Sequence, residues 1–221
     1  MRFYPSSFIV KNLQESMFRK YSPYIKGNVL DVGCGTRPHR RYLANAGEYV
    51  GMDENKSVAP DVLGSAQEIP FPDAYFDCVL CTEVLEHLPE PEKAVNEIKR
   101  VMKKGGILYL TVPQEWGLHY EPNDYLRFTR YGIKYLLEKN GFRVEAVERI
   151  GGIFSLVGDR LVDVKTHIVT RILKPFFGLR SAENISRVLS FPASLMFYFL
   201  GKIGDGIDKR DAICWAVLAV K

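Results

Sequence analysis

The chain has 221 residues, of which 47% are hydrophobic and 25% are charged, a balance typical of a globular protein that buries a full core. Its formal net charge is +4, and residues 151–210 alone contain nine Lys/Arg and five Asp/Glu, so the whole excess lies in this late segment. No basic stripe with interleaved aromatic residues lines the first half, which argues against a nucleic-acid partner.

The first part of the chain, residues 1–27, is predicted to be a helical lid. Phe8, Ile9 and Leu13 recur at helical spacing, which predicts an amphipathic helix that packs on the domain or closes over a cofactor. Residues 1–20 carry charges throughout and contain no sustained apolar run. We therefore expect no secretory signal and a cytoplasmic protein.

A glycine turn follows the first predicted strand. Val29, Leu30 and Val32 read as a short buried strand, and Gly33 and Gly35 allow a tight turn that side chains would block. The residues from Pro38 onward are predicted to begin a helix, so that a ligand lies against bare backbone at the carboxyl end of a sheet. A dinucleotide-binding turn is disfavoured because no third glycine stands three residues after Gly35.

Two acids are placed at the ends of the first two predicted strands. Asp31 precedes the glycine turn, and Asp53 ends the second strand, 22 positions later. An acid at about this spacing commonly accepts hydrogen bonds from a ribose diol. The alternative for Asp53 is a solvated acid at a strand end.

Strands and helices then alternate along the chain. Strands are predicted at 76–81 and 107–112, and helices at 91–102 and 131–140, a pattern that favours a parallel sheet covered by helices on both faces. Cys78 and Cys81 form a C-x-x-C pair, but they lie in a buried strand and no second ligand pair exists. They are interpreted as small core residues, and no metal site is expected.

At this point the chain resembles the class I S-adenosylmethionine-dependent methyltransferases of the small "type 11" sort. The resemblance is carried, in the family's order, by Val29-Leu30-Asp31-Val32-Gly33-Cys34-Gly35, Gly51-Met52-Asp53, Ala66-Gln67-Glu68-Ile69-Pro70-Phe71, Phe76-Asp77-Cys78-Val79, Leu85-Glu86-His87-Leu88 and Lys104-Gly105-Gly106. It implies an α/β fold: a Rossmann-like, doubly wound, seven-stranded mixed sheet with an antiparallel last strand. Residues 142–148 and 211–220 would be its last two strands.

The resemblance also implies S-adenosyl-L-methionine as cofactor. The implied cofactor site comprises Asp31, Gly33, Cys34, Gly35, Asp53, Ser65, Ala66, Gln67, Cys81 and Glu83. Gly33 and Gly35 would back the methionine part, and Asp31 would lie near its amino group. Asp53 would hold the ribose hydroxyls, and Ala66 and Gln67 would flank the adenine. The segment from Cys81 to Glu83 would lie near the sulfonium. Ser65 departs from the family, which usually has an acid there against the adenine amino group.

The acceptor is expected at a polar, aromatic loop, residues 115–129, that follows the fifth strand. His119 is the preferred general base and His87 has a comparable claim, because imidazole titrates near neutral pH. Asp124 and Arg127 would orient the base or bind the acceptor. The alternative is that Asp124 and Arg127 form a structural ion pair and His119 faces solvent.

Residues 151–210 are interpreted as a helical insertion between the core, residues 28–150, and its last strand, residues 211–221. Val188 to Gly201 is a run of 14 uncharged residues, short of the roughly 20 that a membrane-spanning helix needs. Three alternatives stay open for this segment: packing on its own domain, peripheral contact of residues 171–201 with an anionic membrane, or formation of a homodimer.

The function expected from these features is transfer of a methyl group from S-adenosylmethionine to oxygen, nitrogen or carbon of a small-molecule or lipid-linked acceptor. A catalytically silent module that keeps the cofactor-binding fold is the main alternative. A nicotinamide oxidoreductase is a third, and the missing third glycine argues against it.

Overall fold

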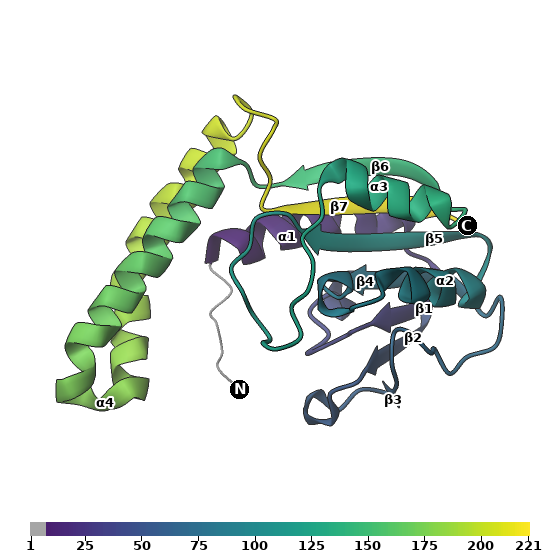
Figure 1. The fold of residues 1–221 in the computed structure, drawn as a ribbon, viewed down its shortest axis with the longest axis horizontal. Helices are drawn as coiled ribbons and strands as arrows, with labels where there is room; N and C mark the ends of the chain where they lie inside the picture. The colour runs from purple at the N-terminus through teal and green to yellow at the C-terminus, as the bar shows by residue number, and fades with distance from the viewer. Residues whose placement is uncertain (1–7) are drawn as a thin grey trace. The chain divides into compact units, whose positions relative to one another are not determined.

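The computed structural model describes residues 8–221, and the first seven residues of the expected lid lie outside this range. The described chain divides into two compact units (Figure 1). The larger, here called the core, comprises Glu15–Arg149 and Cys214–Lys221. The smaller, here called the hairpin unit, comprises residues 8–14 and Ile150–Ile213.

The core is built on a seven-stranded sheet in the order β3-β2-β1-β4-β5-β7-β6. The strands are β1 Gly27–Val32, β2 Ala46–Asp53, β3 Val62–Leu63, β4 Phe76–Thr82, β5 Met102–Pro113, β6 Arg143–Ile150 and β7 Cys214–Val220. Strands β1 to β5 pair in parallel, and β7 pairs antiparallel with β5. The predicted Rossmann-like mixed sheet, with its antiparallel last strand, is confirmed.

The central strands are apolar because helices cover both of their faces. Val29, Leu30 and Val32 in β1 are fully buried, and so are Val79 and Leu80 in β4. Parallel strands end at one edge of the sheet, so the residues that follow β1, β2 and β4 are brought together there.

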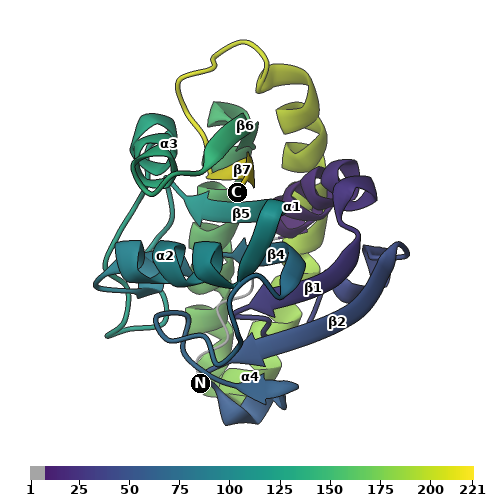
Figure 2. The same ribbon diagram turned by 90° about the vertical axis from the view of Figure 1, so that its right-hand side faces the viewer.

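Helices α2 (Pro91–Val101) and α3 (Arg130–Lys139) lie on one side of the sheet, and the core part of α1 (Phe8–Tyr21) lies on the other (Figure 2). Helix α2 starts with Pro91, whose missing N–H is no loss in a first turn. The hydroxyl of Thr129 caps α3 by accepting a hydrogen bond from the N–H of Gly132 at 3.0 Å.

The helix expected after the glycine turn is not formed. The segment that begins at Pro38 contains only a 3₁₀ turn, Arg40–Tyr42, before β2 starts at Ala46. A single turn makes too few hydrogen bonds to form an α-helix, and the connection is too short to carry a longer one. The prediction of a helix at this position was wrong.

In the hairpin unit, α4 (Ile153–Gly204) is interrupted at Gly178, whose backbone has a φ of 73° and a ψ of 164°. The two halves form a helical hairpin, and the hydroxyl of Thr166 donates to Ser190 Oγ at 2.9 Å across its seam. Pro192 lies inside the continuous second half. Among the described helices, none combines the length and apolar character required to cross a bilayer.

Candidate functional site

The turn between β1 and the 3₁₀ segment needs its glycines. Gly33 has a φ of +66° and Gly35 a φ of +48°, backbone conformations that L side chains rarely adopt. A Cβ on Gly33 would lie 2.4 Å from Val84 Cγ2. At Gly33 the space of a side chain is filled by Val84, whereas a Cβ on Gly35 would meet no described residue within 4 Å, so the backbone is open to a ligand at Gly35.

Asp31 lies at the end of β1 with 1% of its surface exposed. Its Oδ2 accepts a hydrogen bond from the hydroxyl of Tyr49 at 2.5 Å, and its Oδ1 has no partner among the described residues. Burial raises the pKa of Asp31 to about 7, and the charge of Asp53 acts in the same direction. A ligand cation at Oδ1 would supply the missing partner.

Asp53, at the end of β2, is hydrogen-bonded to the glycine turn. Its Oδ2 accepts from the N–H of Gly35 at 2.9 Å, and its Oδ1 accepts from the N–H of Asn55 at 2.8 Å. Each carboxylate oxygen has a second acceptor position, so Asp53 keeps capacity for ligand hydroxyls. Asp53 is therefore not simply a solvated acid.

The residues expected around an adenine follow β3. Ala66 is buried, and the N–H of Gln67 donates to the Ser65 hydroxyl at 3.3 Å. The Gln67 amide donates to the carbonyl of Glu90 at 3.3 Å. Cys34, inside the glycine turn, is buried and its thiol lies 3.8 Å from the carbonyl oxygen of Gly35. These contacts hold the loop. The Ser65 hydroxyl oxygen can accept a second hydrogen bond, for example from a ligand.

Cys81 and Glu83 stand at the end of β4. Cys81 is fully buried in the sheet, whereas Glu83 has a φ of +54°, uncommon for a residue with a Cβ. The Oε2 of Glu83 lies 3.7 Å from the Cys214 thiol, and Oε1 has no hydrogen-bond partner among the described residues. Burial raises the pKa of Glu83. Its carboxylate contributes to a second polar cluster beside the glycine turn.

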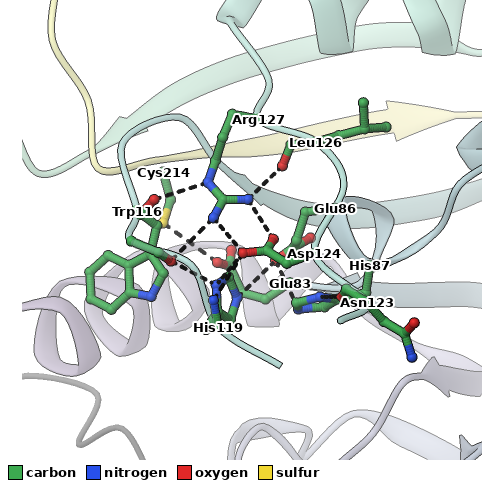
Figure 3. Close-up of polar contacts among 11 residues, drawn as sticks. Glu83, Glu86, His87, Trp116, His119, Asn123, Asp124, Leu126, Arg127 and Cys214 are labelled. Atoms are coloured by element: carbon green, nitrogen blue, oxygen red, sulfur yellow. Dashed lines mark hydrogen bonds and ion pairs between the residues drawn. The ribbon is translucent and has the colours of Figure 1, made fainter. Parts of the chain in front are cut away.

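This second cluster, here called the acceptor-side cluster, consists of Glu83, Glu86, His87, His119, Asp124 and Arg127 (Figure 3). Arg127 forms a fork with Asp124, at 2.7 Å to Oδ1 and 2.8 Å to Oδ2. Asp124 also accepts from the N–H of His119 at 2.9 Å. The Arg127 guanidinium lowers the pKa of Asp124 to about 2. The ion pair between Asp124 and Arg127, which was the alternative for these two residues, is formed, and it holds the loop that carries His119.

The two imidazoles lie side by side, with ring centroids 4.7 Å apart. The His119 side chain is only 12% exposed, so the alternative of a solvent-facing loop residue is wrong. The Nε2 atoms of His87 and His119 lie 3.7 and 4.0 Å from Oε1 of Glu86. Burial lowers the pKa of His87 and raises the pKa of Glu86 well above its ordinary value.

Two residues of these clusters were not predicted to belong to the site. Tyr49 reaches Asp31 from the neighbouring strand, and the sequence alone shows no signal for this pairing. Glu86 was identified only as part of a family motif. Its signal is an acid directly between Leu85 and His87.

Comparison with known proteins finds similarity over the part of the chain that contains the glycine turn. Residues 30–110 match the family model described as "Methyltransferase domain". This part of the chain is therefore similar to a methyltransferase domain. The matched range contains the glycine turn, both acids, Glu86 and His87, whereas His119, Asp124 and Arg127 lie beyond it.

The curated proteins to which the chain is similar include enzymes named for quinone biosynthesis. The "Ubiquinone biosynthesis O-methyltransferase" of Alkalilimnicola ehrlichii is 32% identical over 126 residues, covering 50% of this chain and 49% of the relative. The "Ubiquinone/menaquinone biosynthesis C-methyltransferase UbiE" of Burkholderia mallei is 32% identical over 109 residues, covering 41% of this chain and 45% of the relative. The chain thus spans about half the length of these relatives.

Solved structures share the methyltransferase fold. A SAM-dependent methyltransferase from Archaeoglobus fulgidus has a TM-score of 0.61 at 20% identity, covering 96% of this chain and 94% of that chain. The phosphoethanolamine N-methyltransferase 2 of Haemonchus contortus, solved with S-adenosyl-L-methionine, has a TM-score of 0.58 at 18% identity, covering 95% and 52%. At these identities the likeness concerns the fold.

Proposed function

We propose that the chain binds S-adenosylmethionine and transfers its methyl group to a small-molecule or lipid-linked acceptor. The observation that carries the proposal is the arrangement of two acids around the glycine turn. Asp31 keeps a buried oxygen that has no partner within residues 8–221, and Asp53 is fixed by its hydrogen bond to Gly35. A nucleoside with a cationic amino acid part complements both acids at once.

In this proposal each residue of the first site binds one part of the cofactor. Asp31 accepts from the ammonium group, Asp53 accepts from the ribose hydroxyls, and Ala66 and Gln67 flank the adenine. The bound cofactor supplies a methyl group already activated by a positively charged sulfur. The chain's contribution is then to align the acceptor with that methyl group and to exclude water.

The acceptor-side cluster is proposed to receive the acceptor. His119 and His87 are the groups available to take a proton from a hydroxyl or amine, and Arg127 and Asp124 position the loop that carries His119. The relatives' names include an O-methyltransferase and a C-methyltransferase acting in quinone synthesis, which supports a hydroxylated, lipid-linked ring as one acceptor class.

Transfer of labelled methyl groups tests this function. The protein is incubated with methyl-labelled S-adenosylmethionine and either metabolite pools or hydroxylated aromatic lipids, beside the variant Asp53→Ala. Label entering an acceptor with the native protein, and much less with the variant, supports the proposal. Cofactor binding without transfer to any pool supports the catalytically silent module instead.

A further inference from the structure

We propose that Glu86, His87 and His119 bind a divalent metal ion. Each residue offers one ligand atom, and these three atoms all lie within 4.8 Å of one another. Two imidazoles and one carboxylate are a ligand set that Zn²⁺, Fe²⁺ and Mn²⁺ accept in proteins. No metal site was expected from the sequence, where only the Cys78 and Cys81 pair was considered as ligands; His119 stands more than 30 positions after Glu86 and His87.

The hydrogen bonds of the imidazoles orient them as metal ligands. The Nδ1 atom of His87 lies 2.7 Å from the carbonyl oxygen of Asn123, and that of His119 lies 3.0 Å from the carbonyl oxygen of Gly117. A carbonyl only accepts, so each Nδ1 donates a proton to it, and the Nε2 atom of each ring is left on the side of Glu86. Such a bond to the second ring nitrogen is usual for metal-bound histidine.

Glu86 supplies an independent observation that points to a bound cation. The residue is 0% exposed, and neither carboxylate oxygen has a hydrogen-bond partner among the described residues. A buried carboxylate without partners is costly, and a metal ion would compensate it. Oε1 lies 3.7 and 4.0 Å from the two Nε2 atoms, close to the about 3.4 Å between ligands of a tetrahedral ion with bonds of about 2.1 Å.

Arg127 cannot serve as that cation. Its guanidinium has five N–H donors, and each has an acceptor other than Glu86. They are directed to both oxygens of Asp124 and to the carbonyls of Trp116, Gly117 and Leu126. The guanidinium of Arg127 is therefore already committed to the loop, and Glu86 is left without a cationic hydrogen-bond partner among the described residues.

The use of the metal rests on the proposed function, although the binding itself does not. Three protein ligands leave coordination positions open, and a hydroxyl bound there becomes more acidic. With a metal on their Nε2 atoms, His87 and His119 would no longer take the proton, so an acceptor bound through oxygen would lose it to solvent or to a nearby carboxylate. Its oxygen would then form a bond to the methyl carbon while the bond from that carbon to the sulfonium sulfur breaks and S-adenosylhomocysteine leaves. The site therefore favours a hydroxylated acceptor over an amine.

Metal analysis of the whole chain tests the site without any measurement of methyl transfer. Chelator-treated protein is dialysed against Zn²⁺ or Mn²⁺, and bound metal is quantified; Co²⁺ adds a visible spectrum that reports its coordination. We expect one ion per chain, bound at least tenfold more weakly by Glu86→Gln and His119→Ala. His167→Ala, an exposed histidine of the hairpin unit, is the matched control and should bind as the native chain does.

Circular dichroism confirms that each variant is folded before its metal content is compared. Failure of the native chain to bind any of these ions, or equal binding by the native chain and Glu86→Gln, would overturn the proposal. If metal binds while methyl transfer is absent, the metal site stands and the proposed function fails.

In the hairpin unit, small side chains lie between the two helical halves and large apolar side chains lie outside, the opposite of an ordinary helix pair. The seam between the two halves is formed by small residues, among them Gly158, Ala182, Ser186 and Ser190, which are buried. The outer surface carries large apolar residues instead. Phe176 and Phe177, at the reversal beside Gly178, are 78% and 56% exposed.

The charge of the hairpin completes this pattern. Helix α4 contains seven Lys/Arg and three Asp/Glu, and one of the acids, Asp159, is fully buried. Arg171, Lys174 and Arg180 surround the apolar tip and are exposed. Apolar side chains flanked by basic ones fit a bilayer with anionic headgroups, into which the tip would dip without spanning it.

We propose that the tip of the hairpin, residues 171–180, inserts into an anionic membrane surface. Co-sedimentation with vesicles of phosphatidylcholine alone, or with added phosphatidylglycerol, tests this. We expect the chain to pellet with the anionic vesicles only. Both a Phe176→Ser, Phe177→Ser variant and a Lys174→Glu, Arg180→Glu variant should lose most of that binding.

Tyr131→Ser is the matched control, because Tyr131 is an equally exposed aromatic residue on the core, with 74% of its surface accessible. It should pellet as the native chain does. No pelleting with either vesicle, together with a dimer in light scattering that the Phe176→Ser, Phe177→Ser variant abolishes, would assign the surface to a second copy of the chain instead.

Discussion

The carboxylate of Asp53 accepts a hydrogen bond from the backbone N–H of Gly35, over 2.9 Å between N and Oδ2. This bond ties the end of β2 to the glycine turn after β1. The acid proposed to bind the ribose is therefore the acid that fixes the turn under the methionine part. A change at Asp53 acts on both.

Replacing Asp53 by alanine should weaken binding of S-adenosylhomocysteine by about 1–3 kcal/mol, because a charged acceptor and the support of the turn are both lost. Calorimetric titration measures the change. Glu54→Ala removes the adjacent, exposed acid and should leave the affinity unaltered. Equal affinities of Asp53→Ala and the native chain would remove Asp53 from the site.

The affinity for S-adenosylhomocysteine should depend on pH through Asp31. Burial raises the pKa of Asp31 to about 7, and an ammonium group binds only the ionised carboxylate. Affinity should thus rise with pH, by at most about tenfold per unit below pH 7, and level off above it.

The variants of this pair separate Asp31 from other titrating groups. Asp31→Asn should bind S-adenosylhomocysteine more weakly, and its affinity should not change with pH near pH 7. Tyr49→Phe removes the hydrogen bond that stabilises the ionised carboxylate, so the change in affinity should move to higher pH in this variant. A change in affinity near pH 7 that persists in Asp31→Asn would mean that another group is responsible.

Arg127 is predicted to matter more for the stability of the acceptor-side loop than its partial exposure suggests. Arg127→Ala leaves Asp124, whose side chain is 2% exposed, without its charged partner, and should lower the free energy of unfolding by about 2–3 kcal/mol. Urea unfolding gives the value. Arg127→Ala combined with Asp124→Asn should recover part of the loss, whereas Arg130→Ala on α3 should cost little.

Gly33→Ala should impair both folding and cofactor binding. The added Cβ would lie 2.4 Å from Val84 Cγ2 at a backbone φ of +66°, so either the turn or Val84 must move. We expect a lower melting temperature and a large loss of affinity for S-adenosylhomocysteine. Gly206→Ala, where nothing lies within 4 Å of the new Cβ, is the control and should change neither property.

Much of the core could be predicted from sequence because its signals are local. The buried run Val29–Val32, the two glycines after it and the acid at the end of the next strand each lie within a few residues of one another. The missing helix after Pro38 shows the limit of such signals. Its first turn looks helical, but the start of β2 at Ala46 leaves it no room.

The acceptor-side cluster could not be assembled in the same way. Glu86 and His119 meet only because β4 and β5 end beside each other and the Arg127–Asp124 pair folds the following loop back. The hairpin unit was likewise ambiguous in sequence, because apolar residues at helical spacing predict a helix but not which side of it faces a partner. Its buried serines and exposed phenylalanines appear only in the structure.

The central claim is that the two acids at neighbouring strand ends hold a nucleoside with a cationic amino acid part. Calorimetric titration of the native chain with S-adenosylhomocysteine, and separately with NAD, tests it most directly. We predict one molecule of S-adenosylhomocysteine bound per chain and no heat from NAD. Binding of NAD with no binding of S-adenosylhomocysteine would contradict the account.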